Sequence, residues 1–447
     1  MPNLTPRPDV VTGAGRPEPA LPGTAGRLRR RLGVTDAVVI GLGAMIGAGI
    51  FAALAPAARA AGSGLPIGLT IAAMVAYCNA TSSARLAARY PASGGTYIYG
   101  RERLGRFWGY LAGWAFVVGK TASCAAMALT VGLYTWPAHA HAVAAAAVVA
   151  VIAVDYAGVQ KSAWLTRLIV AVVLAVLAAV AVAAFGSDVA DTARLDLGSN
   201  VTAGGVLQAA GLLFFAFAGY ARIATLGEEV RDPVRTIPRA VPTALAITLV
   251  VYAVVAVAAL LVLGPQRLAQ TPAPLTEVVR AAEAGWLEPV VRAGAAVAAL
   301  GSLLALVLGV SRTTLAMARD RHLFHALAAV HPRYRVPHRA EIAVGVTAAA
   351  VAATADIRAA IGFSSFGVLL YYAIANASAC TLTRSENRPP RLLPALGLAG
   401  CLALVFTLPL SSIATGSVVV AAGALVYGLR RIVAGDPTTR ANENTKH

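Results

Sequence analysis

Glycines at positions 41, 43, 47 and 49 interrupt the first long apolar stretch of the chain, residues 34–58. Two kinds of chemistry use glycines in this way, and both hold an anionic group on backbone N–H groups. A strand followed by a glycine turn holds the pyrophosphate of a dinucleotide at a helix N-terminus. A membrane helix broken by glycine instead exposes unpaired N–H and C=O groups at mid-membrane, where they bind a substrate.

The residues after the glycines decide between these two sites. A dinucleotide site needs an acidic residue about 20 positions further on to hold the ribose. No Asp or Glu occurs between Asp36 and Glu102, and no charged residue of any kind occurs between Asp36 and Arg59. A bilayer core requires about 20 apolar residues of helix, which this segment supplies. The sequence therefore predicts a membrane helix with a break near its middle.

Composition supports the membrane interpretation. Hydrophobic residues make up 58% of the chain and charged residues 13%, whereas soluble domains are about half apolar and a quarter charged. The formal net charge of +17 could suggest a nucleic-acid partner. Nucleic-acid binders, however, gather their cations on one face of a soluble domain. Here the cations lie between apolar runs, so no nucleic-acid partner is predicted.

The apolar runs predict an all-α polytopic membrane protein with about twelve transmembrane helices. If the N-terminus is inside, most Lys and Arg residues fall in the tails, in the loops on that side or at the inner helix ends, as the positive-inside rule requires. We therefore expect a multi-pass protein of the cell membrane that contacts anionic lipid and has both termini in the cytoplasm. The runs are 34–58, 66–88, 107–134, 137–154, 162–185, 204–225, 240–263, 289–317, 341–355, 359–382, 392–409 and 411–429.

The remaining segments suggest neither an enzyme nor a metalloprotein. Residues 1–33 are rich in Pro, Gly and Arg and are predicted to form a disordered cytoplasmic tail, and residues 432–447 form a second polar tail. The four cysteines lie within apolar runs and are predicted to be packing residues. Four histidines between positions 319 and 339 lack the spacing of a metal site. No metal and no cofactor are predicted.

A second glycine-interrupted segment, residues 214–222, lies five helices after the first. Transporters built from two inverted five-helix halves place their broken helices at these positions, the first and the sixth. The repeats would be residues 34–186 and 204–382, and residues 391–431 would supply two extra helices. Arg222 favours a break, because it would otherwise lie within an apolar helix. Alternatively, the sixth run ends near Gly219 and Arg222 lies at the interface.

Six stretches in order give the chain a family resemblance. It resembles the amino acid–polyamine–organocation superfamily, and within it the bacterial amino acid permeases. The resemblance implies transport of amino acids by alternating access, without a cofactor. The stretches are Ile46-Gly47-Ala48-Gly49-Ile50-Phe51, Pro91-Ala92-Ser93-Gly94-Gly95-Thr96-Tyr97, Gly109-Tyr110-Leu111-Ala112-Gly113-Trp114, Phe214-Phe215-Ala216-Phe217-Ala218-Gly219-Tyr220, Glu228-Glu229-Val230-Arg231-Asp232-Pro233 with Ile237-Pro238-Arg239-Ala240, and Ser311-Arg312 with Ala316-Met317-Ala318-Arg319-Asp320.

The resemblance also implies a substrate site made of backbone. The break that begins at Ile46 would present the amides of Gly47, Ala48 and Gly49 to the carboxylate of an amino acid, at the positive end of a half-helix. The ammonium group would bind carbonyls freed at both breaks. Those expected are the carbonyls of Met45, Phe215 and Ala218. The alternative is that these small residues only allow close packing between helices.

Side-chain selectivity is expected from helices six and eight. Phe215, the family's gate position, with Phe217 and Tyr220, can form an aromatic lid, and Leu306 or Val307 can line the opposite wall. Many relatives carry an acidic residue after the Gly-aromatic pair of helix six, where this chain has Ala221. Neutral amino acids are therefore favoured as substrates. The alternative is an antiporter that exchanges cationic amino acids or polyamines. Arg222 leaves an anionic substrate open.

Lys120 is the candidate for coupling or gating, because an intramembrane lysine usually faces a cavity or a transport pathway. Some proton-coupled relatives carry a lysine in helix five, but residues 169–174 contain no ionisable group. The alternatives are a structural lysine bonded to carbonyls of a broken helix, uncoupled exchange of amino acids, and sodium coupling through Ser302.

Charges at the inner helix ends can form a gate latch or simply anchor the interface. Glu228 and Glu229 follow helix six, with Arg222 before them. The others are Arg231, Asp232, Arg312, Arg319 and Asp320.

Other classes of membrane protein fit less well. An intramembrane enzyme needs an acid–base or nucleophile set, whereas the apolar runs, away from their ends, contain one lysine and essentially no carboxylate or histidine. A channel needs a ring of polar residues or a filter repeat, which the sequence lacks. The prediction is a transporter, either monomeric or a homodimer.

Overall fold

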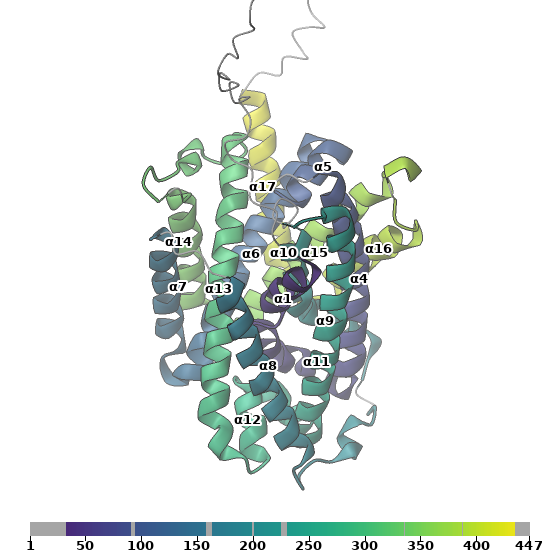
Figure 1. Ribbon diagram of the computed structural model, residues 1–447, viewed down its shortest axis with the longest axis vertical. Helices are drawn as coiled ribbons and strands as arrows, with labels where there is room; N and C mark the ends of the chain where they lie inside the picture. Colours follow the sequence, from purple (N-terminus) through teal and green to yellow (C-terminus); the bar gives the residue numbers. More distant parts are fainter. Residues whose placement is uncertain are drawn as a thin grey trace, which may run out of the picture.

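The computed structural model describes residues 33–90, 94–157, 163–198, 201–224, 230–334, 336–386 and 388–433. These residues form an all-α bundle (Figure 1). Its α-helices are α1 (Val34–Met45), α2 (Ala48–Ala52), α3 (Leu54–Ala61), α4 (Leu65–Arg89), α5 (Thr96–Leu104), α6 (Arg106–Thr135), α7 (Ala140–Tyr156), α8 (Ala163–Phe185), α9 (Ala203–Phe217), α10 (Ala221–Ala224), α11 (Pro233–Gln270), α12 (Pro274–Ala281), α13 (Glu288–Arg319), α14 (His338–Thr354), α15 (Ile357–Cys380), α16 (Leu392–Thr407) and α17 (Leu410–Val433).

The predicted class, an all-α polytopic membrane protein, is confirmed. Among the described residues, 10 helical segments are long and apolar enough to cross a membrane. The predicted runs nine and eleven correspond to α14 and α16, which have 17 and 16 residues. These two helices are shorter than the other spans, so the count of about twelve is reached only when they are included.

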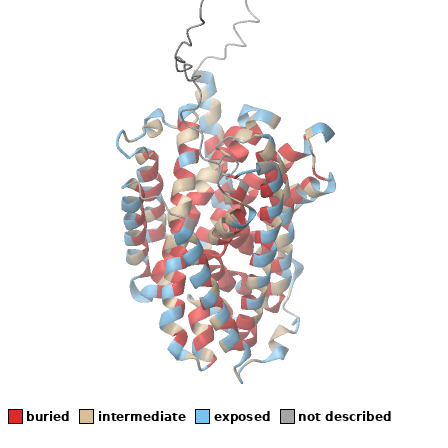
Figure 2. Ribbon diagram, viewed as in Figure 1, coloured by how far each residue is buried: buried red, intermediate tan, exposed pale blue. Residues whose placement is uncertain are grey.

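The helices run along the long axis of the molecule (Figure 1). One end of the bundle carries α5 and the opposite end carries α12; we call them the α5 end and the α12 end. Helices α7 and α14 pack together at one flank, and α13 lies beside them. Buried residues concentrate inside the bundle, and exposed ones lie on its outer faces and at its two ends (Figure 2). Hydrophobic exposed faces are expected of helices that contact lipid.

The first predicted break is present. Helix α1 ends at Met45, and Ile46 and Gly47 leave the helical conformation, with ψ values of 63° and −137°. The chain resumes a helical path as α2 and, after Ala53, as α3. Two apolar half-helices therefore meet at a two-residue interruption, as the glycine spacing predicts.

The second break is a change of helix type. Helix α9 passes into a 3₁₀ turn, η4 (Ala218–Tyr220), and then into α10, which includes Arg222. Helical turns thus continue to Ala224, while the apolar span itself ends at Tyr220, so the break and the alternative of an end near Gly219 both stay predictions. The division into two five-helix repeats stays a prediction.

Two short helices were not among the predicted elements. Helices α5 and α12 have 9 and 8 residues and connect longer helices at opposite ends of the bundle. Both contain several charged residues, so neither forms an apolar run. Helix α11 bends at Gly264, whose φ of 69° is left-handed, directly before Pro265. A glycine adopts that angle without the steric cost that a side chain would add.

Candidate functional site

The two breaks lie against each other in the middle of the bundle. A Cβ atom on Gly219 of η4 would overlap the carbonyl of Ala44 and lie 2.7 Å from the nitrogen of Met45. A Cβ atom on Gly49 of α2 would lie 2.7 Å from the Cα of Ala216 on α9. The backbones of the two interrupted helices are therefore in direct contact, and any side chain at these glycines would force them apart.

Helix α13 closes a further side of the first break. A Cβ atom on Gly47 would overlap Oγ of Ser302 and lie 2.8 Å from its Cβ. Ser302 is 4% exposed, and its hydroxyl has no hydrogen-bond partner among the described residues. A buried hydroxyl without a partner is costly unless something else binds it. Ser302 thus places a free polar group at the point where α1 is interrupted.

A tyrosine that the sequence analysis did not single out joins the two breaks. Tyr252 of α11 is fully buried, and its hydroxyl lies 2.6 Å from the carbonyl oxygen of Met45 and 3.3 Å from that of Ala216. The amide of Gly47 also donates to the Met45 carbonyl, at 2.8 Å. One sequence signal for Tyr252 exists: it is the lone polar side chain between Val250 and Leu263.

The predicted lid residues are buried, and Phe217 packs on Tyr252 of α11 whereas Tyr220 packs on Tyr372 of α15. Phe215 and Ala218 are buried, and the hydroxyl of Tyr372 on α15 donates to the Ala218 carbonyl at 3.5 Å. The ring of Tyr220 lies 5.0 Å from that of Tyr372, and its hydroxyl lacks a hydrogen-bond partner among the described residues. Two of the carbonyls assigned to a substrate ammonium, those of Met45 and Ala218, therefore accept tyrosine hydroxyls in this structure.

Comparison with known proteins decides the family. Residues 32–429 match the amino acid permease family. The chain belongs to this family. It is 75% identical over 406 residues to an uncharacterized transporter of Mycobacterium tuberculosis, covering 91% of this chain and 92% of that one. It is 25% identical over 441 residues to the branched-chain amino acid permease BcaP of Bacillus subtilis, covering 90% and 93%. It is 27% identical over 389 residues to human cationic amino acid transporter 4, covering 81% and 61%.

The resemblance predicted from the six stretches is thus confirmed, and the permease is a membrane transporter with an amino acid as its small-molecule substrate. This assignment indicates a transporter and not an enzyme.

Tyr252→Phe is expected to lower the transport rate of the permease about fivefold. The substitution removes a hydrogen bond worth about 1 kcal/mol that fixes the two breaks relative to each other. Initial rates of amino acid exchange in proteoliposomes measure the effect. Tyr77→Phe, on the exposed face of α4, serves as the matched control and should leave the rate unchanged. Equal rates in both variants would contradict a role for the Tyr252 hydroxyl.

Another tyrosine, Tyr134, links α2 and α12 through its hydroxyl. The hydroxyl of Tyr134 on α6 donates to the carbonyl of Phe51 at 2.9 Å and accepts from the amide of Leu275 on α12 at 3.3 Å. A cavity of about 140 Å³ lies beside Tyr134, with Glu277 and Arg280 in its lining. Tyr134 thus separates the half-helix that follows the first break from a cavity at this end.

Lys120 lies on α6 and is 7% exposed. Its role, whether in coupling and gating or as a structural lysine, stays a prediction. Its neighbour Gly119 packs on Gly367 of α15, where an added Cβ would lie 3.2 Å from the Cα of Gly367. Val307, expected to line the site, packs with Cys124 and other residues of α6, α7 and α14 in a separate cluster.

The expected latch residues are only partly described. Glu228 and Glu229 lie outside the described residues, and Arg222 is half-buried on α10. Asp320, at the end of α13, pairs with Arg101 of α5 at 2.8 Å and accepts a hydrogen bond from Tyr97. Its partners therefore come from the helix that the sequence pattern did not predict. The Tyr97 hydroxyl also contacts Nδ1 of His322 at 2.9 Å, and burial lowers the pKa of His322.

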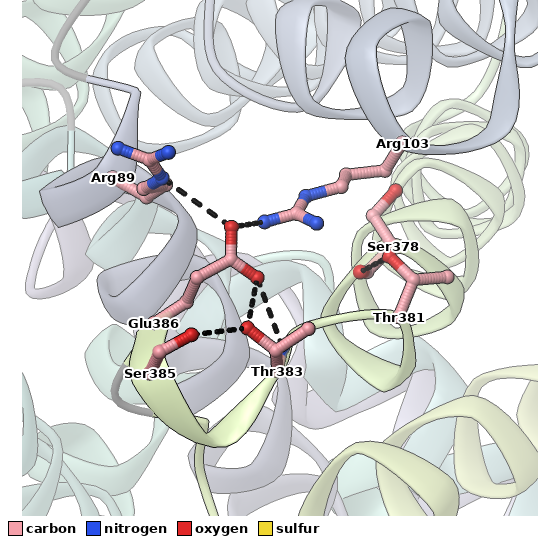
Figure 3. Close-up of polar contacts among 7 residues, drawn as sticks. All are labelled: Arg89, Arg103, Ser378, Thr381, Thr383, Ser385 and Glu386. Carbon is pink, nitrogen blue, oxygen red and sulfur yellow. Dashed lines mark hydrogen bonds and ion pairs between the residues drawn. The ribbon is translucent and has the colours of Figure 1, made fainter.

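Glu386 forms a second junction at the α5 end, after α15 (Figure 3). Arg89 at the end of α4 and Arg103 of α5 both point to its carboxylate. The amide and the hydroxyl of Thr383 each donate to it at 2.9 Å. One carboxylate therefore ties α4 and α5 to the segment that follows α15.

The Glu386 junction predicts a pH-dependent contribution to stability. The amide of Thr383, and then Arg103, lower the pKa of Glu386 to about 2 from an ordinary value of 4.5. The contribution is thus complete above about pH 4.5 and is lost as the pH falls towards 2. Glu386→Gln should lower the melting temperature of the detergent-purified protein at neutral pH. The gap to wild type should shrink below pH 4.5.

Glu102→Gln, which removes an exposed carboxylate of α5, is the control and should leave the melting temperature nearly unchanged. A gap between Glu386→Gln and wild type that stays constant down to acidic pH would refute the assignment.

Proposed function

We propose that this permease moves neutral amino acids across the cytoplasmic membrane by alternating access. The observation that carries the proposal is the first break, where Ile46 and Gly47 interrupt a buried helix against the unpartnered hydroxyl of Ser302. The amides of Ala48 and Gly49 begin the second half-helix and are the proposed donors to the substrate carboxylate. The amide of Gly47 is a third proposed donor, and it becomes available when its hydrogen bond to the Met45 carbonyl breaks.

The carbonyls of Met45, Phe215 and Ala218 are the proposed partners of the substrate ammonium. A carbonyl oxygen has two lone pairs, so a tyrosine hydroxyl and an ammonium can share it. Binding of a substrate ammonium beside the Tyr252 and Tyr372 hydroxyls would then couple substrate binding to the positions of α11 and α15. Backbone recognition of this kind leaves the amino acid side chain to the aromatic residues at Phe215 and Tyr220.

A neutral side chain fits the contacts at the breaks. The side chains that meet them are those of Ser302, Tyr252 and Tyr372, and position 221 carries alanine, so none of these is a carboxylate that could pair with a cationic side chain. The similarity to a permease named for branched-chain amino acids agrees with this class. The second candidate is a cationic amino acid or polyamine, exchanged by antiport, since another relative is named a cationic amino acid transporter.

Counterflow in proteoliposomes tests class and substrate together. Vesicles that contain the purified permease are loaded with one unlabelled amino acid or polyamine at a time, and uptake of the same labelled compound is followed. Trans-stimulated uptake of branched-chain or other neutral amino acids, and none with arginine, lysine or putrescine, is the expected result. Stimulation by the cationic compounds alone would favour the second candidate. Failure with every compound would refute the function.

Lys120 is proposed as the coupling or gating cation of proton symport. Lys120→Ala is expected to lose accumulation driven by a pH gradient while it retains exchange between equal concentrations. Accumulation ratios with and without an imposed pH gradient measure the difference. Full pH-driven accumulation in Lys120→Ala would refute the coupling role, and absence of pH-driven accumulation in the wild type would favour uncoupled exchange. A sodium gradient that drives accumulation would instead implicate Ser302.

The α5 end is proposed to face the cytoplasm. It carries Arg89, Arg101 and Arg103, and Lys and Arg concentrate on the cytoplasmic side of membrane proteins. Both termini would then be cytoplasmic.

A further inference from the structure

Two acidic side chains are buried where α7 and α14 meet near the α5 end. Asp155, at the end of α7, is 1% exposed, and Glu341, in the first turn of α14, is 0% exposed. The two carboxyl groups are close enough to interact electrostatically. No other Asp or Glu of the described residues is as deeply buried.

Among the described residues, the pair lacks most of the hydrogen bonds that buried carboxylates require. Both oxygens of Glu341 and Oδ2 of Asp155 lack a partner among the described residues. A buried carboxylate without donors is costly, and two like charges side by side add to that cost. Two negative charges on the pair are therefore energetically unfavourable. A proton bound by the pair would remove the repulsion and supply a donor.

Among the described residues, one cation acts electrostatically on both carboxyl groups. This cation, Arg312 of α13, forms no ion pair with either of them. Arg312 carries one positive charge, so among the described residues it compensates at most one negative charge of the pair. Lys120 of α6 interacts with Cys124 and not with the pair.

The packing beside the pair limits what it can bind. A Cβ atom on Gly345, one turn after Glu341, would overlap the side chain of Ile152 on α7. Among the described residues, no group of three or more His, Cys, Asp and Glu side chains could hold a metal ion. Two carboxyl groups in a tightly packed helix interface suit a proton, which needs no coordination sphere.

Titratable side chains lie beside the pair at the start of α14. His338 lies three residues before Glu341, on the same face of α14, and its Nδ1 has no hydrogen-bond partner among the described residues. The His338 ring lies 6.2 Å from that of Tyr156, the residue after Asp155, and 5.5 Å from that of His331. In the part of the chain that the structure describes, the titratable and charged groups near the pair are Tyr156, His331, Arg333, Tyr334, His338 and Arg339, with Arg312 on α13.

We propose that Asp155 and Glu341 form a proton-binding site that exchanges with the α5-end solution through His338. Loss of the proton leaves two charges, which draw Arg312 and with it α13, the helix that carries Ser302 to the first break. Occupancy of the pair would thus set the position of α13. The proton-binding site is inferred from the burial and the unpartnered oxygens of the pair. Its effect on the position of α13 matters only if the proposed transport function holds.

Infrared spectroscopy of the full chain in lipid vesicles tests the site without transport. A protonated carboxyl group has a C=O stretch well separated from the carboxylate and amide bands. At neutral pH, the wild type is expected to show the C=O band of the protonated pair. Glu341→Gln and Asp155→Asn are each expected to lose this band, and the double variant must lose it. Glu102→Gln, which removes an exposed carboxylate, should retain the band. Retention of the band in the double variant would overturn the proposal. Size-exclusion profiles confirm that each variant is folded.

Counterflow at varied internal pH tests the consequence. The wild-type rate is expected to change several-fold between acidic and alkaline internal buffers, and Glu341→Gln, which mimics the neutral acid, should be insensitive. If Glu341→Gln retains the same pH dependence of the rate as the wild type, the link to α13 is overturned even if the infrared band is lost. A wild type inactive with every substrate would instead refute the proposed function and leave the infrared result standing.

Discussion

Gly47→Ala is expected to reduce amino acid counterflow about 100-fold. The added methyl group would overlap the hydroxyl of Ser302 and lie 2.8 Å from its Cβ, so α1 and α13 must separate where the first break presents its amides. Overpacking of this kind costs about 3 kcal/mol, which corresponds to roughly 100-fold. Initial counterflow rates, normalised to the amount of folded protein, measure the loss.

Ser302→Gly provides a specific rescue of Gly47→Ala. Without Oγ and Cβ at position 302, the next atom that the new methyl group would meet is the Ala298 carbonyl oxygen, at 3.5 Å, an ordinary contact. The double variant should therefore transport faster than Gly47→Ala alone. Gly309→Ala, on the same helix and with nothing within 4 Å, should be neutral. A fully active Gly47→Ala would show that the break does not depend on this close approach.

Gly219→Ala is expected to be at least as damaging, and no side-chain truncation should rescue it. Its methyl group would overlap the carbonyl of Ala44, and the next atom is the Met45 nitrogen at 2.7 Å. These are backbone atoms, so the clash is relieved only if η4 moves away from α1. We expect lost counterflow together with a lower melting temperature.

The two glycine variants separate a steric effect on a side chain from one on the backbone. Addition of Ser302→Gly should restore Gly47→Ala and leave Gly219→Ala unchanged. Rescue of both variants by Ser302→Gly would mean that they act through a general loosening of the bundle. A stable and active Gly219→Ala would contradict the direct contact between the two breaks.

Long apolar runs made most of the helices predictable. A segment that crosses lipid must satisfy its backbone hydrogen bonds internally, so about 20 apolar residues imply a helix. The runs 107–134 and 162–185 accordingly correspond to α6 and α8 within a few residues. Helices α5 and α12 escaped prediction because they are short and carry charges. The junctions made by Arg101 and Arg103 on α5 could therefore not be foreseen.

The membrane fold, the family and the positions of both interruptions were predictable from the chain's residues, because hydrophobicity and glycine act locally. The contacts that surround the breaks depend on residues far apart in sequence. Tyr252 meets the Met45 carbonyl from 207 residues away, and Ser302 faces Gly47 from another helix. Asp155 and Glu341 likewise become a pair only where α7 and α14 pack together. Tertiary structure alone decides such contacts, because helix packing brings together side chains that no periodicity relates.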